Sequence, residues 1–300
     1  MKPAALLCLF ALFLSPAVRA QDGAPEKAAL AKAMKLADAL KYQDGEVTLR
    51  GDLAKLKLPR ELRYLGPDDA ATVLERIWGN PPSRAKTLGL LVPASIPIIA
   101  PNSWAVIITY EEDGYVKDDD ATKINYDDLL KQMREDVKAG NAEREKQGYD
   151  SIELVGWAAT PRYEAAAKKM YWAKELKFER APENTLNYNI RVLGRRGVLV
   201  LNAVAGMAQL PDIEAATPMI LRAVDFQEGH RYADFQPGKD KVATYGLAAL
   251  VAGGVLAKTG FLKVLITAAL AAKKFVIIGV IALWGTIKKL FGKKSDDPHA

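Results

Sequence analysis

The sequence is poor in the residues that nucleophilic enzymes use. Its 300 residues include one cysteine, Cys8, and two histidines. It contains no G-x-S-x-G, H-E-x-x-H, C-x-x-C or P-loop pattern, so it signals no Ser-His or Cys-His pair and no common zinc or nucleotide site. We interpret His230, the one histidine ahead of the apolar C-terminal region, as a polar contact near a membrane. These absences favour a non-enzymatic protein without cofactor or metal.

Acidic residues are absent from a long stretch near the C-terminus. From Val242 to Leu290 the sequence is apolar and rich in small residues, and lysine is its only charged residue. A helix needs about 20 apolar residues to cross a bilayer. This stretch is too long for one crossing, so part of it must turn or lie flat.

Two membrane arrangements fit this stretch. In the first, Val242 to about Leu262 crosses once and the remainder forms an interfacial helix on the cytoplasmic side. In the second, two spans form a hairpin that turns near Lys258. A buried hairpin in a soluble core is a third interpretation, which the lack of acids disfavours.

The lysines of the stretch favour the first arrangement. On a helix, five of them fall within an arc of about 160°, which is typical of an interfacial helix, and the positive-inside rule places them in the cytoplasm. We predict that six lysines lie at the membrane interface: Lys258, Lys263, Lys273, Lys274, Lys288 and Lys289.

The N-terminus has the pattern of a signal peptide. Lys2 precedes an apolar run from Ala4 to Leu14, and Val18-Arg19-Ala20 is typical of a cleavage site. Cleavage after Ala20 removes Cys8, so the mature protein would have no disulfide, thiol nucleophile or thiolate metal site. The pattern predicts a bacterial protein whose main domain is exported to the periplasm and anchored in the inner membrane.

The net charge of +6 is unevenly distributed. Nine lysines and two aspartates lie from Lys241 to the end, and the signal peptide adds two cations, so the exported body is slightly acidic. The basic excess therefore indicates a lipid bilayer as partner rather than nucleic acid.

The body has the pattern of an α+β domain. Residues 169–179 and 186–192 alternate between apolar and polar side chains, a turn follows at Gly194–Gly197, and residues 198–204 form an apolar strand. Helical patterns occur before and after these strands. We predict a signal peptide (residues 1–20), an exported α+β domain with a mainly antiparallel sheet and flanking helices (21–235), and a neck followed by C-terminal membrane helices with a basic tail (236–300).

Several short stretches resemble a known family of bacterial membrane-anchored proteins, the domain-of-unknown-function family 2167. They are Gly156-Trp157, Pro161-Arg162-Tyr163, Tyr171-Trp172-Ala173, Asn187-Tyr188 through Gly194, and above all Phe226 to Gly254. The last includes Gly229, Arg231-Tyr232-Ala233-Asp234-Phe235, Asp240-Lys241 and Tyr245-Gly246. The resemblance implies an envelope protein with a C-terminal anchor, and it implies no catalytic residues. The order of the late strands is also similar to the folds of the photosystem protein P and the Ran-binding factor Mog.

Aromatic residues give the main candidate for a ligand site. Trp157, Tyr163 and Tyr171 fall on neighbouring strands, where they could stack on a sugar or a peptide. The simpler interpretation is that they are core and surface aromatics, with Trp172 in the core and Tyr171 outside.

Charged residues give three further candidates. The acidic segment, Glu111 to Asp120, could bind a hard cation through Asp113, Asp118, Asp119 and Asp120, but we interpret it as a solvated turn. Glu153, Glu164 and Glu175 could supply a pair of catalytic carboxylates. Arg195-Arg196 could contact a phosphate, or form a solvated hairpin tip.

We therefore predict a binding or scaffold module of the cell envelope, with a possible envelope-protein partner. The alternatives are an envelope hydrolase that uses carboxylates, and a factor that binds or remodels membranes through its lysine-rich C-terminal helix.

Overall fold

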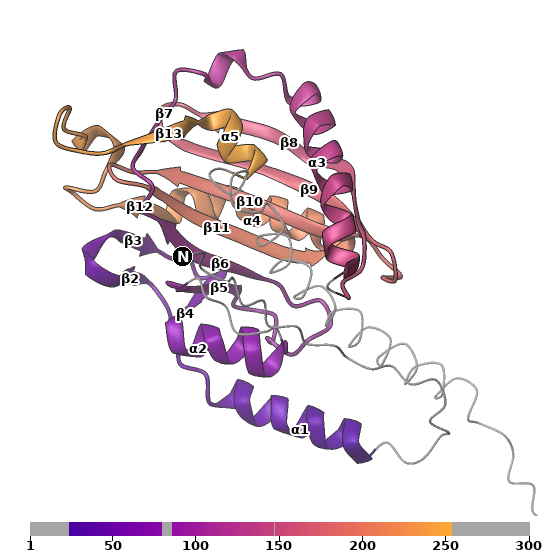
Figure 1. Ribbon diagram of the computed structural model, residues 1–300. Coiled ribbons are helices and arrows are strands. Elements are labelled where there is room, and N and C mark those ends of the chain that lie inside the picture. The colour runs from indigo at the N-terminus through magenta and orange to yellow at the C-terminus, as the bar shows by residue number, and fades with distance from the viewer. Residues whose placement is uncertain (1–23, 80–85, 147, 254–300) are drawn as a thin grey trace, which may run out of the picture.

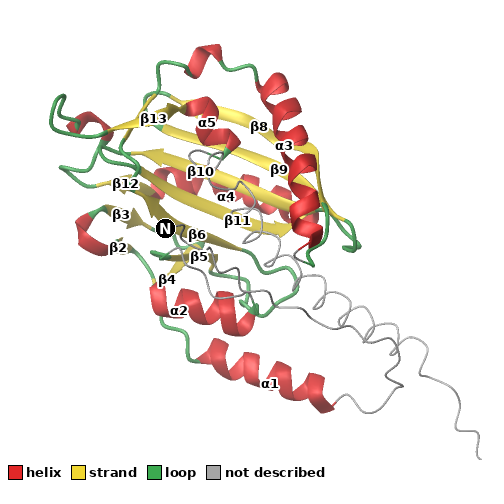
Figure 2. Ribbon diagram, viewed as in Figure 1, coloured by secondary structure: helices red, strands yellow, loops and turns green. Residues whose placement is uncertain are grey.

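The computed structural model describes residues 24–79, 86–146 and 148–253. The fold is α+β and is built on an eight-stranded antiparallel sheet, as the sequence predicts (Figures 1 and 2). The order of its strands is β1-β4-β5-β6-β11-β10-β9-β8. Their bounds are β1 Tyr42–Gln43, β4 Leu62–Leu65, β5 Gly89–Pro93, β6 Ala105–Glu111, β8 Ile152–Glu164, β9 Lys169–Phe178, β10 Thr185–Leu193 and β11 Val198–Gly206.

The large sheet joins two meanders, β4 to β6 and β8 to β11. They meet where β11 pairs with β6, and Val198 lies opposite Glu111 in that pairing. The turn between β10 and β11, which the sequence predicts, closes with a bond from Gly194 N to Gly197 O of 2.8 Å. Because of this register, the acidic segment that follows β6 begins beside the β10–β11 turn.

The remaining strands form two small sheets. Their members are β2 Glu46–Thr48, β3 Ala54–Lys57 and β12 Val224–Phe226 in one, and β7 Tyr115–Lys117 with β13 Val242–Gly246 in the other. The pair β7–β13 is parallel. It therefore brings the acidic segment next to the beginning of the predicted anchor.

Among the described residues, five helices cover the two faces of the large sheet. They are α1 Ala24–Asp38, α2 Pro67–Ala71 with a π-helical continuation over Thr72–Ile77, α3 Tyr126–Lys146, α4 Leu210–Ala223 and α5 Leu247–Ala252. In Figure 1, α4 lies behind the sheet, and α3 and α5 lie in front of it. The helices α1 and α2 pack on the same front face at its β4–β5 end.

The helix α4 runs without a break through Pro218. Proline costs a helix interior one backbone hydrogen bond. Ile213 and Ile220, on either side of the proline, are buried against the sheet. We infer that this tertiary packing outweighs the local preference.

The side chains of α3 protect the exposed edge of β8. Asn141 Nδ2 donates to Ile152 O and its Oδ1 accepts from Ile152 N, both at 2.9 Å, as a neighbouring strand would. Arg134 Nε donates to Leu154 O at 3.1 Å. An open edge is a template for pairing between molecules, so these side chains keep β8 from acting as one.

We expect Asn141→Ala to lower the free energy of unfolding by about 2 kcal/mol, because it leaves a buried donor and a buried acceptor of Ile152 unsatisfied. The variant should also aggregate faster than the wild type. Chemical denaturation and light scattering of the purified protein measure both effects. Glu145→Ala, at an exposed position of the same helix, is the control. Wild-type stability and solubility in Asn141→Ala would show that α3 does not protect the edge.

The region Val242–Ala252 differs from the predicted start of a membrane span. Its residues form β13 and α5, and Leu247, Leu250 and Val251 are buried in the front-face core. Across the described part of the chain, each helix is too short or too polar to span a bilayer. The predicted signal peptide and the lysines Lys258, Lys263, Lys273, Lys274, Lys288 and Lys289 lie outside the described residues.

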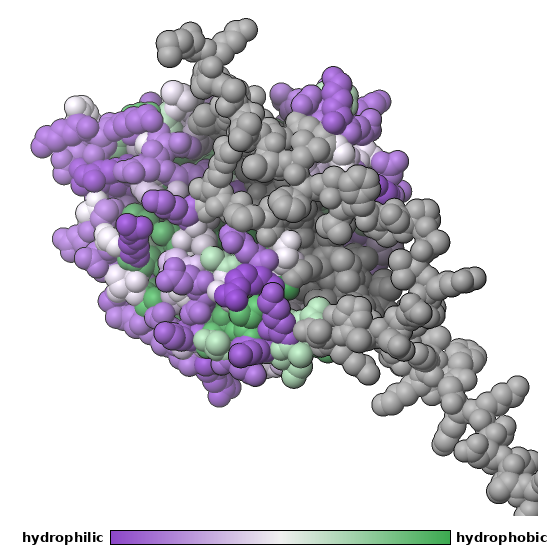
Figure 3. Space-filling view, turned by 60° about the horizontal axis from the view of Figure 1, so that its bottom comes forward, coloured by the Kyte–Doolittle hydropathy of each residue, from purple (hydrophilic) through white to green (hydrophobic). Residues whose placement is uncertain are grey.

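Figure 3 brings the lower end of Figure 1 forward and shows mostly hydrophilic surface around small hydrophobic areas. Among the described residues, the exposed large hydrophobic side chains are Leu30, Met34 and Val242. Leu30 and Met34 lie one helical turn apart on α1. The described surface is therefore of ordinary polarity.

Candidate functional site at the junction of the acidic segment and the neck

The acidic segment binds the neck (Gly229 to Lys241) and the elements that follow it. Tyr115 N donates to Lys241 O at 2.8 Å where β7 meets β13. Asp113, Asp118 and Asp120 each accept hydrogen bonds from residues beyond position 231. The interpretation of this segment as a solvated turn is therefore wrong for these three carboxylates, although Asp119 is exposed.

Asp118 is the centre of this junction. Its Oδ2 accepts from Tyr163 Oη and from Lys168 Nζ, both at 2.6 Å. Tyr232 Oη lies 3.0 Å from Asp118 Oδ1 and 3.0 Å from Val116 O. Burial raises the pKa of Asp118, but the hydrogen bonds from Lys168, Tyr163 and Tyr232 outweigh burial and leave the pKa below its ordinary value. Burial and the neighbouring carboxylate raise the pKa of Tyr163, so its phenol stays a donor.

An aromatic stack supports the same contact. Tyr115 of β7 lies between Tyr232 and Phe235 of the neck, with ring centroids 4.3 Å and 4.0 Å apart. The ammonium group of Lys168 lies 4.7 Å from the ring centroid of Tyr232. Stacking and cation–π contacts add to the hydrogen bonds of Asp118.

Two further carboxylates hold the residues after the neck. Asp113 Oδ2 accepts from Tyr245 Oη at 2.8 Å. Asp120 accepts from the backbone N–H groups of Leu247 and Ala248 at 3.1 Å and 3.2 Å, and so satisfies the first turn of α5. The path of the chain from β13 into α5 is therefore fixed by side chains more than a hundred residues earlier.

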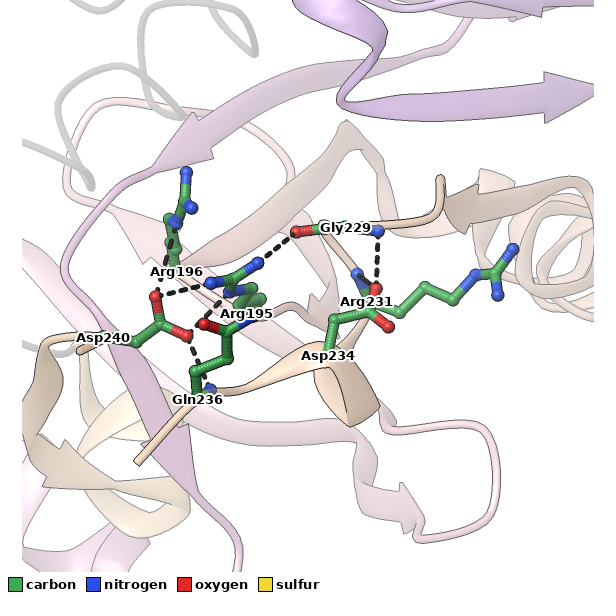
Figure 4. Close-up of polar contacts among 7 residues, drawn as sticks. All are labelled: Arg195, Arg196, Gly229, Arg231, Asp234, Gln236 and Asp240. Carbon is green, nitrogen blue, oxygen red and sulfur yellow. Dashed lines mark hydrogen bonds and ion pairs between the residues drawn. The ribbon is translucent and has the colours of Figure 1, made fainter. Parts of the chain in front are cut away.

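The neck itself closes on the β10–β11 turn (Figure 4). Arg195 binds Asp240 with two parallel hydrogen bonds, Nε to Oδ2 at 2.7 Å and Nη2 to Oδ1 at 3.0 Å. The two side chains are 12% and 5% exposed, so the interpretation of Arg195 as part of a solvated tip is wrong. Gln236 N also donates to Asp240 Oδ2, at 2.7 Å. The hydrogen bond from Arg195 is the main reason that the pKa of Asp240 falls to about 2.

The other end of the neck is held by Asp234, whose Oδ2 accepts from Gly229 N at 2.7 Å and Arg231 N at 2.9 Å (Figure 4). His230 contributes its backbone oxygen, which accepts from Arg195 N at 2.9 Å. These bonds make the neck a set of tight turns rather than a flexible linker.

The polar groups of the junction hold segments of the same chain together. Its carboxylates bind phenols, backbone amides and cations of the same chain, so they have little left for a ligand. Within residues 24–79, 86–146 and 148–253, no three or more histidine, cysteine, aspartate or glutamate side chains are grouped to hold a metal ion.

The predicted aromatic cleft is divided between the two faces of the sheet. Trp157 and Tyr163 pack on the front face, where Trp157 Nε1 donates to Tyr126 O at 3.3 Å. Tyr171 packs on the opposite face, in the core that α4 covers. Trp172 is buried, as expected. The structure therefore brings Trp157 and Tyr163 to one face and separates Tyr171 from them.

The three glutamates of the hydrolase hypothesis do not form one group. Glu164 lies opposite Lys169, six residues along β9 from Glu175. At about 3.3 Å per residue the two are roughly 20 Å apart, which is too far for an acid pair. Glu153 is exposed at a diagonal position across β8 and β9, and Glu175 accepts from Asn184 Nδ2 at 2.6 Å.

Motif searching missed the junction because its partners are far apart in the sequence. Tyr163 and Asp118 are 45 residues apart, and Tyr245 and Asp113 are 132 apart. One signal in the sequence, the family resemblance, could have revealed the junction. The strongest family resemblance runs through Gly229, Tyr232, Asp234, Asp240 and Tyr245, and the structure gives each of these residues a contact in the junction.

Comparisons with known proteins give distant structural neighbours. A solution structure of cyanobacterial PsbP (CyanoP) from Synechocystis sp. PCC 6803 is 11% identical, covers 63% of this chain and 94% of its own, and has a TM-score of 0.32. LpqN of Mycobacterium tuberculosis, involved in cell envelope biogenesis, is 13% identical with coverage of 65% and 96% and a TM-score of 0.31. The Ran-binding protein Mog1p of Saccharomyces cerevisiae is 9% identical with coverage of 66% and 100% and a TM-score of 0.32.

The comparison with curated proteins gives no match. A family model, described as "Protein of unknown function (DUF2167)", matches residues 41–284. The chain therefore belongs to the DUF2167 family.

Proposed function

We propose that this protein is a binding or scaffold module of the bacterial cell envelope, anchored in the inner membrane by its C-terminal region, with its α+β domain in the periplasm. The N-terminal signal pattern and the apolar, lysine-punctuated C-terminal sequence support the location. In the described residues, Glu164 lies far from Glu175 along β9, and Glu175 accepts a hydrogen bond from Asn184, which favours binding over hydrolysis.

One observation supports the scaffold role above the others: the neck and the two elements that follow it, β13 and α5, are fixed to the domain as far as residue 253. Asp240 is held by Arg195, and Tyr232 by Asp118, immediately before the apolar C-terminal sequence. A domain on a flexible tether would sample every orientation above a membrane. A domain fixed through this junction would present one chosen face to its partner.

Single-cysteine labelling tests the location, because the one native cysteine, Cys8, lies in the predicted signal peptide. We expect Lys177→Cys, at an exposed position of β9, to react with a membrane-impermeant maleimide in spheroplasts. Ala300→Cys should react only after permeabilisation if the chain crosses once. Labelling of Lys177→Cys only after lysis, or recovery of the protein without membranes, would refute the proposal.

Crosslinking of the intact protein in its own membrane tests the scaffold role. The wild type should give specific crosslinked partners. Arg195→Gln should stay in the membrane and give fewer of them, because the neck loses its two hydrogen bonds from Arg195 to Asp240. Unchanged crosslinks in Arg195→Gln would mean that the rigid neck is not needed for binding.

A further inference from the structure

The strand β10 has a polar face that is buried. One face is apolar and packs toward α4, with Leu186, Tyr188, Ile190 and Val192 in the core. The other consists of Thr185, Asn187, Asn189 and Arg191, and all four residues are buried. This polar face lies on the front of the sheet, between α3 and α5 at one end and α1 and α2 at the other (Figure 1).

The amides beside Arg191 are oriented by its guanidinium group. Arg191 Nη1 donates to Asn202 Oδ1 at 3.0 Å and to Ile190 O at 3.1 Å, and Nη2 donates to Asn189 Oδ1 at 3.3 Å. A guanidinium group has no acceptor, so each amide must turn its oxygen toward it. Asn189 Nδ2 then donates to Asn187 Oδ1 at 2.9 Å. The amide nitrogens of Asn187 and Asn202 are left over.

The groups that remain on this face are all donors. Three of the five N–H groups of Arg191 are engaged, and its Nε–H has no hydrogen-bond partner in the described part of the chain. Trp172 pairs with Asn189 in the sheet register, is 1% exposed, and its Nε1–H is buried without a partner among the described residues. The guanidinium of Arg191 lies 5.1 Å from the centroid of the Trp172 ring. A buried donor without an acceptor is costly.

The charge on this face is also positive. Burial lowers the pKa of Arg191 to about 10, so its guanidinium stays charged at neutral pH, yet within the described residues it forms no ion pair. Glu111 of β6 and Tyr245 are the acidic groups that act on its charge. Burial and the charge of Arg191 lower the pKa of Lys174 on β9 to about 7. A buried cation such as the guanidinium of Arg191 is stable only with compensation.

Arg195 shows what the Nε–Nη2 edge of a guanidinium group binds in this protein. Its Nε and Nη2 groups hold both oxygens of Asp240. In Arg191 the Nε–H and the second N–H of Nη2 have no hydrogen-bond partner among the described residues, and Trp172, Asn187 and Asn202 lie on the same face of the sheet. A set of donors around a cation is complementary to an oxygen anion.

We propose that this donor site (Arg191, Trp172, Asn187 and Asn202) binds an oxyanion, a carboxylate or a phosphate group of a small ligand. The Nε–Nη2 edge of Arg191 receives two of its oxygens, and the other donors bind the further oxygen of a phosphate group or the second lone pairs of a carboxylate. The inference rests on the proposed binding role and names the chemical class of the ligand.

Titration of the detergent-solubilised mature protein tests this site. Sodium phosphate and sodium acetate are compared with sodium chloride at equal ionic strength, by calorimetry and by thermal unfolding. One of the two oxyanions should bind and raise Tm more than chloride does. A response to phosphate alone assigns a phosphoryl ligand, and a response to acetate assigns a carboxylate. Equal effects of all three salts on the wild type overturn the proposal.

Variants assign the binding to the donor site. Arg191→Gln should raise Kd about 10- to 100-fold, because hydrogen bonds to a charged group are lost. Arg60→Gln removes the same charge at a side chain that is 94% exposed and should bind as the wild type does. Oxyanion binding with wild-type affinity in Arg191→Gln refutes the site.

A second variant covers the case in which Arg191→Gln does not fold. Asn187→Asp keeps the size of the side chain and the acceptor for Asn189, and it places a negative charge beside the site. It should abolish oxyanion binding, and wild-type affinity in it refutes the site. These measurements need no membrane, so failure of oxyanion binding is distinguishable from failure of the labelling test of the anchor.

Discussion

Asp118→Ala is expected to lower the free energy of unfolding by about 3 kcal/mol. Hydrogen bonds to a charged group contribute about 1.5–3 kcal/mol each, and Asp118 accepts from Tyr163, Lys168 and Tyr232. The three bonds share one carboxylate that is 24% exposed, so their contributions do not simply add. Chemical denaturation of the purified protein, followed by tryptophan fluorescence, measures the loss.

The adjacent residue gives a matched control. Asp119→Ala removes the same charge from an exposed side chain, and we expect a change of less than about 0.5 kcal/mol. Hydrogen exchange should separate a local effect from a global one. In Asp118→Ala the backbone amides of β13 and α5 should exchange faster, because the neck has lost its central contact. Equal stability of the two variants would contradict the role given to Asp118.

The contribution of Asp118 should depend on pH in a defined direction. Its pKa is lower in the folded protein than in the unfolded chain, where an aspartate titrates near 3.9. The stabilisation is therefore fully present above that value and is lost as pH falls through the folded pKa. The difference in unfolding free energy between the wild type and Asp118→Asn should be constant near neutral pH and shrink below about pH 4. A difference that grows in acid would contradict the assignment.

Part of the large sheet could be predicted from local patterns, because β9 and β10 largely alternate and β11 is a continuous apolar run. In β10 polar and apolar residues alternate from Thr185 to Val192, β9 alternates except around Ala173 and Lys174, and Gly194–Gly197 marks the turn. Alternation does not reveal how the two meanders join. The pairing of β6 with β11 is a contact between distant segments, and neither strand carries a local signal for it.

The residues Val242–Ala252 show where composition misleads. Ala243, Leu247 and Val251 have the side chains of a membrane helix, and the sequence assigns them to one. In the structure they complete the front-face core because β7 supplies a strand partner and Asp120 supplies acceptors for the first turn of α5. Both partners lie far upstream, so a window along the sequence cannot include them.

The strand register decided which predicted site residues come together and which do not. Tyr171 and Tyr163 are close in sequence on adjacent strands, yet the alternation of strand side chains puts them on opposite faces. Asp118 and Tyr232 are distant in sequence and touch. Residue type suggested an aromatic cleft, whereas the register determined which side chains meet.

Gly197→Ala is expected to lower the free energy of unfolding by at least about 3 kcal/mol. A Cβ atom at this position would overlap the backbone oxygen of Glu111 and crowd the Cα of Glu112. Overpacking of a rigid interior costs about 1–3 kcal/mol even where side chains can adjust, and here the obstructing atoms are backbone. The methyl group can be accommodated only if β11 moves away from β6, or if the acidic segment moves from its place beside the turn.

Gly156→Ala separates crowding from the general effect of removing a glycine from a strand. The nearest atom to its added Cβ would be Arg134 Nη2 at 3.5 Å, an ordinary contact, so its stability should stay within about 0.5 kcal/mol of the wild type. Denaturation midpoints of both variants measure the difference. In Gly197→Ala the damage should spread to the junction, because Gly114 N donates to Arg196 O at 3.0 Å in the same turn. If Gly197→Ala were as stable as Gly156→Ala, the close approach of the β10–β11 turn to the acidic segment would not exist in solution.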